Sequence, residues 1–168
     1  MGDDEIRPQH KPRTQEDKPS DREIVYLLHS VLYALQSAIN TPSKGVLIYA
    51  ARKLPLFLGK FGFSIDTSKS PEENVRALLD ILQETGYLEN VEFVKIDERV
   101  YELRIKKCKI AETGVHDVLK PEKAFCPFAI AVAAILQEVV DEDVVMSDSE
   151  FTEEGSITRM RTYRYVVV

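Results

Sequence analysis

The sequence predicts an α+β fold, in which an antiparallel β-sheet packs against a layer of helices within one domain. Apolar residues recur at helical spacing through the first half of the chain and again over 126–140. Between these stretches, and again at the end of the chain, the spacing changes to strand-like alternation. The expected order is helix, helix, helix, strand, strand, helix, strand, strand, and 168 residues suffice to enclose one core.

Composition and charge restrict the class of function. The formal net charge of −6 leaves no basic stripe that could neutralise phosphates, so we expect no nucleic-acid partner. No apolar run reaches the roughly 18–20 residues of a membrane span, and the first residues lack the apolar core of a secretory signal. Two cysteines do not make a disulfide framework. We therefore expect a cytoplasmic protein with no membrane span.

The first 20 residues are predicted to be a disordered tail, because they are rich in proline and charge and hold few apolar groups. The single folded domain is expected over 21–168. Ser20 and Glu23 form a capping box at the start of the first helix, which should end near Asn40. The apolar residues expected on one face of this helix are Ile24, Leu27, Leu28, Val31, Leu35, Ala38 and Ile39.

The segment KGVLIYAARKLPLFLGKFGF is the most apolar part of the chain, and we expect it to be a buried helix kinked at Pro55. Its small residues Ala50, Ala51, Gly59 and Gly62 would let another backbone or a ligand approach closely. Plain core packing explains the same composition, so both interpretations stay open.

A second capping box, formed by Ser70 and Glu73, predicts a third helix that Gly86 closes. Residues 91–98 and the alternating stretch from Tyr101 to Lys106 should then pair as a β-hairpin. A last helix is expected from Cys126, followed by one or two closing strands near the C-terminus. The acidic stretch 141–154 is interpreted as a solvated turn, since it lacks the spaced aspartates and glycine of a calcium loop.

No catalytic motif is present. The sequence has no glycine-rich phosphate loop, no nucleophile elbow and no HExxH zinc motif, so we expect no catalytic residues and no enzyme activity. A nucleophilic cysteine assisted by His116 is a remaining alternative, although no orienting partner is identifiable. His29 lies among apolar residues of the first helix and is expected to be a core histidine.

Cys108, His116 and Cys126 form a candidate metal site. Zinc accepts thiolate and imidazole ligands, and Glu112, a distant residue or water could complete the tetrahedron. The lysines next to Cys108 and the helix start at Cys126 should favour thiolates. Cysteines that serve only as small buried apolar residues are the competing interpretation.

Four segments resemble the hydrocarbon-binding domain of the vinyl-reductase type (4-vinyl reductase domain), which is related in fold to small subunits of the TRAPP trafficking complex. They are the kinked apolar segment, the turn LQETGYLENVEFVKID, the strand YELRIKKCKIA and the cysteine-led helix FCPFAIAVAAILQ. The resemblance covers about residues 22–168. It implies an antiparallel sheet packed against helices and a homodimer formed through the helical face.

The resemblance also implies a zinc ion beside an apolar pocket. By position, Cys108 and Cys126 match the cysteines that end the strand and open the last helix, and His116 stands where another cysteine is expected. Zinc is accordingly the expected cofactor, with Cys108, His116 and Cys126 as its ligands.

Two functions follow as expectations. The first is a binding or sensory module for a hydrocarbon, aromatic or lipid-like molecule, which would signal through a separate protein. The second is a ligand-free homodimeric assembly subunit resembling the TRAPP small subunits. The residues expected to contact the apolar ligand are Tyr49, Leu54, Phe57, Leu58 and Phe61.

Overall fold

The structure is a computed structural model that describes residues 27–29, 32, 35–36, 56, 59, 63–119, 124–147 and 149–164. The tail over 1–20 lies outside the described residues, as does most of the segment over 44–63. The elements with defined bounds are α4 (Pro71–Glu84), β1 (Leu88–Asp97), β2 (Val100–Cys108), the 3-10 helix η4 (Ala111–Thr113), α5 (Val115–Leu119), α6 (Pro127–Val140), β3 (Asp143–Met146), β4 (Glu150–Phe151) and β5 (Ser156–Tyr163).

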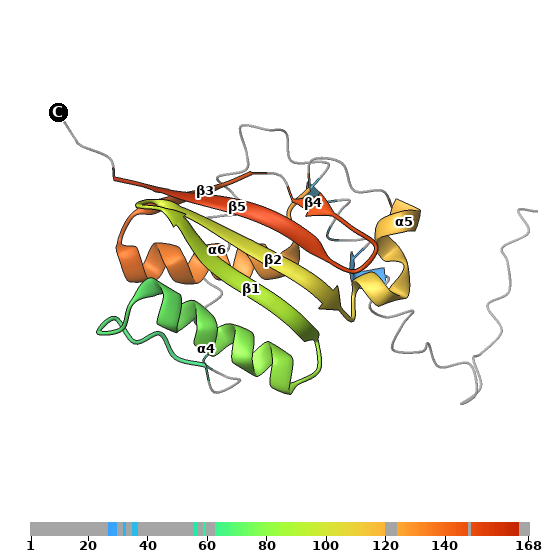
Figure 1. The fold of residues 1–168 in the computed structure, drawn as a ribbon, viewed down its shortest axis with the longest axis horizontal. Helices are drawn as coiled ribbons and strands as arrows, with labels where there is room; N and C mark the ends of the chain where they lie inside the picture. The colour runs from blue at the N-terminus through green and yellow to red at the C-terminus, as the bar shows by residue number, and fades with distance from the viewer. Residues whose placement is uncertain are drawn as a thin grey trace, which may run out of the picture.

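The predicted α+β class is confirmed. The five strands form one antiparallel sheet in the order β1-β2-β5-β3, and the short β4 pairs with β5. Helices α4 and α6 pack against each other and cover one face of this sheet (Figure 1). The expected hairpin is β1 with β2, and β5 is the expected closing strand. No helix among the described residues is long and apolar enough to cross a membrane.

Alternation along β2 separates the two faces of the sheet. Tyr101, Leu103 and Ile105 are buried in the core that α4 and α6 close, and Arg104 on an alternate position is exposed. In β5 the same pattern buries Met160. The change from helical to alternating spacing therefore locates this hairpin correctly, because a side-chain period of two puts successive residues on opposite faces.

Glu102 departs from the alternation, since it lies on the outer face and is only 2% exposed. Arg159, its direct partner on β5, donates from Nε to Oε2 at 2.7 Å, and the Nε of Arg104 donates to Oε1. The hydrogen bond from Arg159, assisted by Arg104, holds the pKa of the Glu102 carboxyl below its ordinary value. A buried carboxylate is tolerated here because both of its oxygens are paired with charge.

The start and end of α4 agree with the sequence prediction. The Glu73 amide donates to Ser70 Oγ at 3.2 Å, and the Ser70 amide donates to Glu73 Oε2 at 2.8 Å, which completes the capping box. Gly86, with a φ of +75°, follows the helix in the left-handed conformation that glycine favours. Local signals were sufficient for this helix because both its caps lie within its own segment.

The three described residues of the apolar face predicted for the first helix are exposed. Leu27, Leu28 and Leu35 are helical but 57–63% exposed, whereas Gln36 is buried, as is His29 in agreement with the prediction. The Gln36 side chain accepts from the backbone N–H of Phe125 at 2.6 Å and donates to its carbonyl at 3.1 Å. The helix turns a polar side chain inward because these two backbone groups ahead of α6 are buried and need partners.

The acidic stretch 141–154 is not the solvated turn that the sequence suggested. It contains β3 and β4, and Val144 and Met146 of β3 are buried against α6. β3 pairs with β5 in an antiparallel register that joins Val144 to Thr162 and Met146 to Met160. β3 is short and carboxylates flank it, so the acidic composition of the stretch wrongly indicated a solvated turn in place of a strand.

Gly155 lies where the turn between β4 and β5 meets β2. Its N–H donates to Thr152 Oγ1 at 3.0 Å, and its carbonyl accepts from the Thr152 amide at 2.9 Å. A Cβ at position 155 would lie only 2.0 Å from the Ile105 carbonyl oxygen. Because that oxygen belongs to the backbone of the neighbouring strand, it cannot move aside without disturbing the sheet.

We predict that Gly155→Ala lowers the free energy of unfolding by about 3 kcal/mol or more, since the added methyl collides with backbone. The matched control is Gly86→Ala, where a Cβ meets nothing within 4 Å and only the left-handed φ is unfavourable. This control should cost about 1–2 kcal/mol. Urea unfolding followed by circular dichroism compares the two, and equal losses would contradict the close approach of Gly155 to β2.

Candidate functional site

One cysteine ends β2 and the other begins α6. Cys108 is the last residue of β2, and Cys126 is the N-cap residue of α6, with Pro127 at the first helical position. Both side chains are buried and both are free thiols. The two thiols are close enough for Cys126 to influence the ionisation of Cys108. That the two cysteines share a metal site stays a prediction of the sequence.

Hydroxyl groups of β5 and of the loop before β4 form hydrogen bonds at Cys126. The Cys126 N–H donates to Ser149 Oγ at 2.8 Å, and Ser149 Oγ lies 2.6 Å from Thr158 Oγ1. Ser156 adds a hydrogen bond with the Cys126 side chain. No motif singles out Ser149, Ser156 or Thr158 in the sequence, and the only signal for them is small polar residues on the inward positions of a strand. Hydrogen bonds through these hydroxyls connect the start of α6 to β5.

Both thiols are held in the protonated form. Burial raises the pKa of Cys108 to about 11, and the neighbouring Cys126 contributes in the same direction. Burial also raises the pKa of Cys126, against the smaller opposing effect of the hydrogen bond with Ser156. A thiol removed from water loses the solvation that its charged form needs. At neutral pH neither side chain is an activated nucleophile.

The expected stabilisation of thiolates by nearby lysines is wrong. Lys106, Lys107 and Lys109 place their ammonium groups 2.8–3.3 Å from the carboxylates of Glu92, Glu89 and Glu112, respectively. Their charge is thus balanced at the surface, and burial decides the ionisation of Cys108. The position of Cys126 at a helix start likewise does not outweigh its desolvation.

His116 lies in α5 and is buried against the turn that follows β4. Its Nδ1 is 3.0 Å from the Thr152 carbonyl oxygen, and its ring meets the Phe151 ring edge to face with centroids 4.8 Å apart. Because a carbonyl oxygen only accepts, Nδ1 carries the proton and Nε2 has the free lone pair. Burial lowers the pKa of His116, which keeps the imidazole neutral near pH 7.

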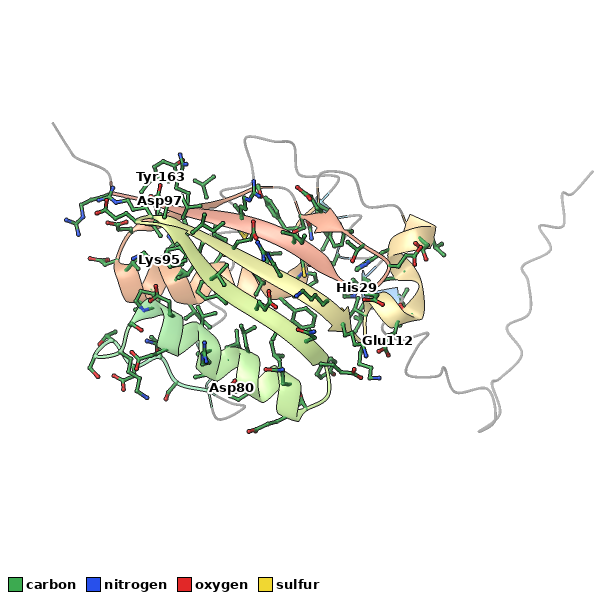
Figure 2. The ribbon with its side chains drawn as sticks, in the orientation of Figure 1. His29, Asp80, Lys95, Asp97, Glu112 and Tyr163 are labelled. Atoms are coloured by element: carbon green, nitrogen blue, oxygen red, sulfur yellow. The ribbon has the colours of Figure 1, made fainter. Side chains whose placement is uncertain are left out.

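The metal site was predicted from Cys108, His116 and Cys126. Over the described ranges no three histidine, cysteine, aspartate or glutamate side chains form a group that could hold a metal ion. Glu112, the candidate fourth ligand, pairs with Lys109 at 2.9 Å and faces solvent at one end of the sheet (Figure 2). Zinc therefore stays a prediction of the sequence.

The residues predicted to line the apolar pocket lie outside the described residues. These are Tyr49, Leu54, Phe57, Leu58 and Phe61. Leu56, within the same segment, is helical and 69% exposed. The ligand-binding assignment of this segment therefore stays a prediction.

Comparison with known proteins finds no matching family model, no matching curated protein and no matching solved structure. The resemblance to the hydrocarbon-binding domain accordingly rests on the sequence pattern alone.

We predict that both thiols of the folded protein react with iodoacetamide at pH 8 at least about a hundredfold more slowly than a free cysteine, because protonation and burial both suppress attack. In urea both should react at the rate of the free amino acid. Mass spectrometry of the alkylated protein measures each rate, and Cys126→Ser isolates Cys108. Fast alkylation of either thiol without unfolding would contradict the protonated, buried state.

Proposed function

We propose that this chain is a binding module for an apolar small molecule of the hydrocarbon, aromatic or lipid-like class, and that it is not an enzyme. One observation carries the proposal: α4, the β1–β2 hairpin, the cysteine-led α6 and the closing strands build an antiparallel sheet covered by helices. This is the arrangement that the resemblance implies for a hydrocarbon-binding domain. The apolar segment over 44–63 would supply the contacts to the ligand.

The chemistry around the cysteines favours binding over catalysis. A cysteine nucleophile must be a thiolate, and burial raises the pKa of both Cys108 and Cys126. The imidazole of His116 is hydrogen-bonded through Nδ1 to a backbone carbonyl. These side chains fit a structural role at the junction of β2 and α6, whether or not a metal joins them.

Substitution of Phe57 tests the proposed pocket. We expect Phe57→Ser to weaken binding of anilinonaphthalene sulfonate to the native protein by at least about tenfold, because a buried phenyl ring contributes roughly 1.5–3 kcal/mol. Leu56→Ser is the matched control: Leu56 is the neighbouring apolar residue but is exposed, so dye binding should not change. Fluorescence titration measures both.

Native mass spectrometry of the freshly purified protein extends this test. A retained organic mass would support the binding module and identify the ligand class, and a mass matching zinc that is lost in Cys108→Ser would support the metal. Equal dye affinity in Phe57→Ser and the native protein, with no retained organic mass, would overturn the apolar pocket.

A homodimeric assembly subunit is the second candidate function, and the first helix favours it. Leu27, Leu28 and Leu35 are helical and exposed, whereas the nearby His29 and Gln36 are buried. An outward apolar face of this kind is typical of helices that pack against a second copy, and it is consistent with the helical dimer that the resemblance implies.

We predict that Leu28→Glu with Leu35→Glu converts a dimer into a monomer, because each exposed leucine buried at an interface contributes about 1.5–3 kcal/mol. The fold should survive, since neither side chain is in the core. Val118→Glu on α5 is the control, because Val118 is 65% exposed on a different element. Light scattering after gel filtration gives the mass, and an unchanged mass in the double variant would remove the leucine face from the interface.

A further inference from the structure

Two neighbouring arginines of β5 point away from the core that α4 and α6 close. β5 lies between β2 and β3, and its residues alternate between that core and the outer face of the sheet. The outward residues, in order, are Ile157, Arg159, Arg161 and Tyr163. The side chain of Arg159 is 67% exposed, and Tyr163 is 43% exposed. The outward positions of this strand therefore present cations, and no carboxylate, to solvent.

A buried carboxylate holds the first of these arginines in place. Glu102 of β2 stands directly opposite Arg159 and is 2% exposed, although it lies on the outer face. Arg159 and Arg104 each donate to it from Nε, Arg159 at 2.7 Å. Because a guanidinium has five N–H donors, a bond through Nε leaves N–H groups of the terminal nitrogens for a second acceptor. Burial of a carboxylate is unfavourable in itself, and we interpret Glu102 as the group that orients the two arginines.

Arg161 carries the second guanidinium of β5. It lies two residues along the strand from Arg159, a separation of about 7 Å. Its cross-strand partners are Val100 of β2 and Val145 of β3, and no carboxylate in the part of the chain that the structure describes forms a salt bridge with it. An arginine among apolar side chains is typical of the residues that carry the affinity of a protein interface.

One further carboxylate lies near this pair. Glu150 of β4 is exposed and stands opposite Ile157. The hydrogen bond with Glu102 and, more weakly, the charge of Glu150 raise the pKa of Arg159. Over the described ranges Glu150 forms a salt bridge with neither arginine, so both can accept an anion from another molecule.

An open sheet face suits a protein segment better than a free anion. An ion pair left in water contributes little, because solvent screens it. A segment that also covers neighbouring apolar side chains excludes water from the pair and strengthens it. Val94 and Val145 lie on this face and are 37% and 51% exposed. Nucleic acid or an anionic bilayer would instead be repelled by a chain of net charge −6.

We propose that the outer face of β5 binds an extended acidic segment of a partner protein, in which carboxylates at alternate positions pair with Arg159 and Arg161. Alternate side chains of an extended segment are about 7 Å apart, which matches the spacing of the two arginines. Apolar residues two positions further along in each direction would contact Ile157 and Tyr163. This face includes neither the apolar segment nor the exposed leucines, so failure of either proposal leaves the other standing.

Fluorescence anisotropy of a labelled Val-Ser-Glu-Ser-Glu-Ser-Val peptide, titrated with the full chain at low salt, tests the proposal. We expect saturable binding that Arg161→Gln weakens by about tenfold, the usual effect of losing a hydrogen bond between charged groups. Arg161 is exposed and supports no other side chain, so this variant should fold. Arg76→Gln on α4 is the matched control: it makes the same change of charge at an exposed position and should leave the affinity unchanged.

Glu102→Gln distinguishes orientation from charge. The substitution removes a negative charge from the face, so charge alone predicts tighter binding of the acidic peptide. Loss of the oriented arginine predicts binding weaker by about threefold or more. Glu150→Gln removes the same charge from an exposed position and should not weaken binding. Circular dichroism checks that each variant is folded, and Arg161→Gln decides the proposal alone if Glu102→Gln unfolds.

Four outcomes would overturn the proposal. An absence of saturable binding would mean that no site exists, and equal losses in Arg161→Gln and Arg76→Gln would mean diffuse attraction. Tighter binding of a duplex oligonucleotide or of phosphatidylserine vesicles than of the peptide, lost in Arg161→Gln, would assign the face to a polyanion. A change in the mass of the chain on Arg161→Gln, measured by light scattering, would assign it to contacts between copies.

Discussion

The pairing of β5 with β2 is the interaction on which the rest of the sheet depends. β5 lies between β2 and β3, and β4 pairs with β5 as well, so without it β3 and β4 would have no partner strand and β2 would keep only β1. Gly155 lets the turn before β5 lie directly against the Ile105 carbonyl, and Arg159 of β5 closes over Glu102 of β2. Gly155 and the Arg159–Glu102 ion pair thus favour one register between β2 and β5, which are distant in the sequence.

Helix α6 connects two chemically different ends of this sheet (Figure 1). At its start, Cys126 lies next to the hydroxyls of Ser149 and Ser156, and burial keeps the thiols of both Cys126 and Cys108 protonated. At its end, Glu138, Asp141, Glu142 and Asp143 line a cavity together with Arg164. The negative end of the helix dipole adds to the negative potential of the carboxylates at the end of α6. The positive end lies at Cys126, but its effect on the pKa of the thiol is smaller than the effect of desolvation.

In the described part of the first helix, a polar side chain is buried because it pairs with buried backbone groups. Both backbone groups of Phe125 are buried ahead of α6, and the amide of Gln36 is the side chain that pairs with both. Meeting that requirement turns the leucines outward. Exposed apolar side chains of this kind are typical of surfaces that contact a partner.

The sequence by itself determined the α+β class, the capping box of α4, the β1–β2 hairpin and the start of α6. Most of these depend on local signals, namely caps and side-chain periodicity within a single segment. Only the tertiary structure decided which face of the first helix is buried, that β3 and β4 form within an acidic stretch, and that both thiols stay protonated. Each of these depends on groups brought together from distant segments, by hydrogen bonding to Phe125, by pairing with β5 and by desolvation in the core.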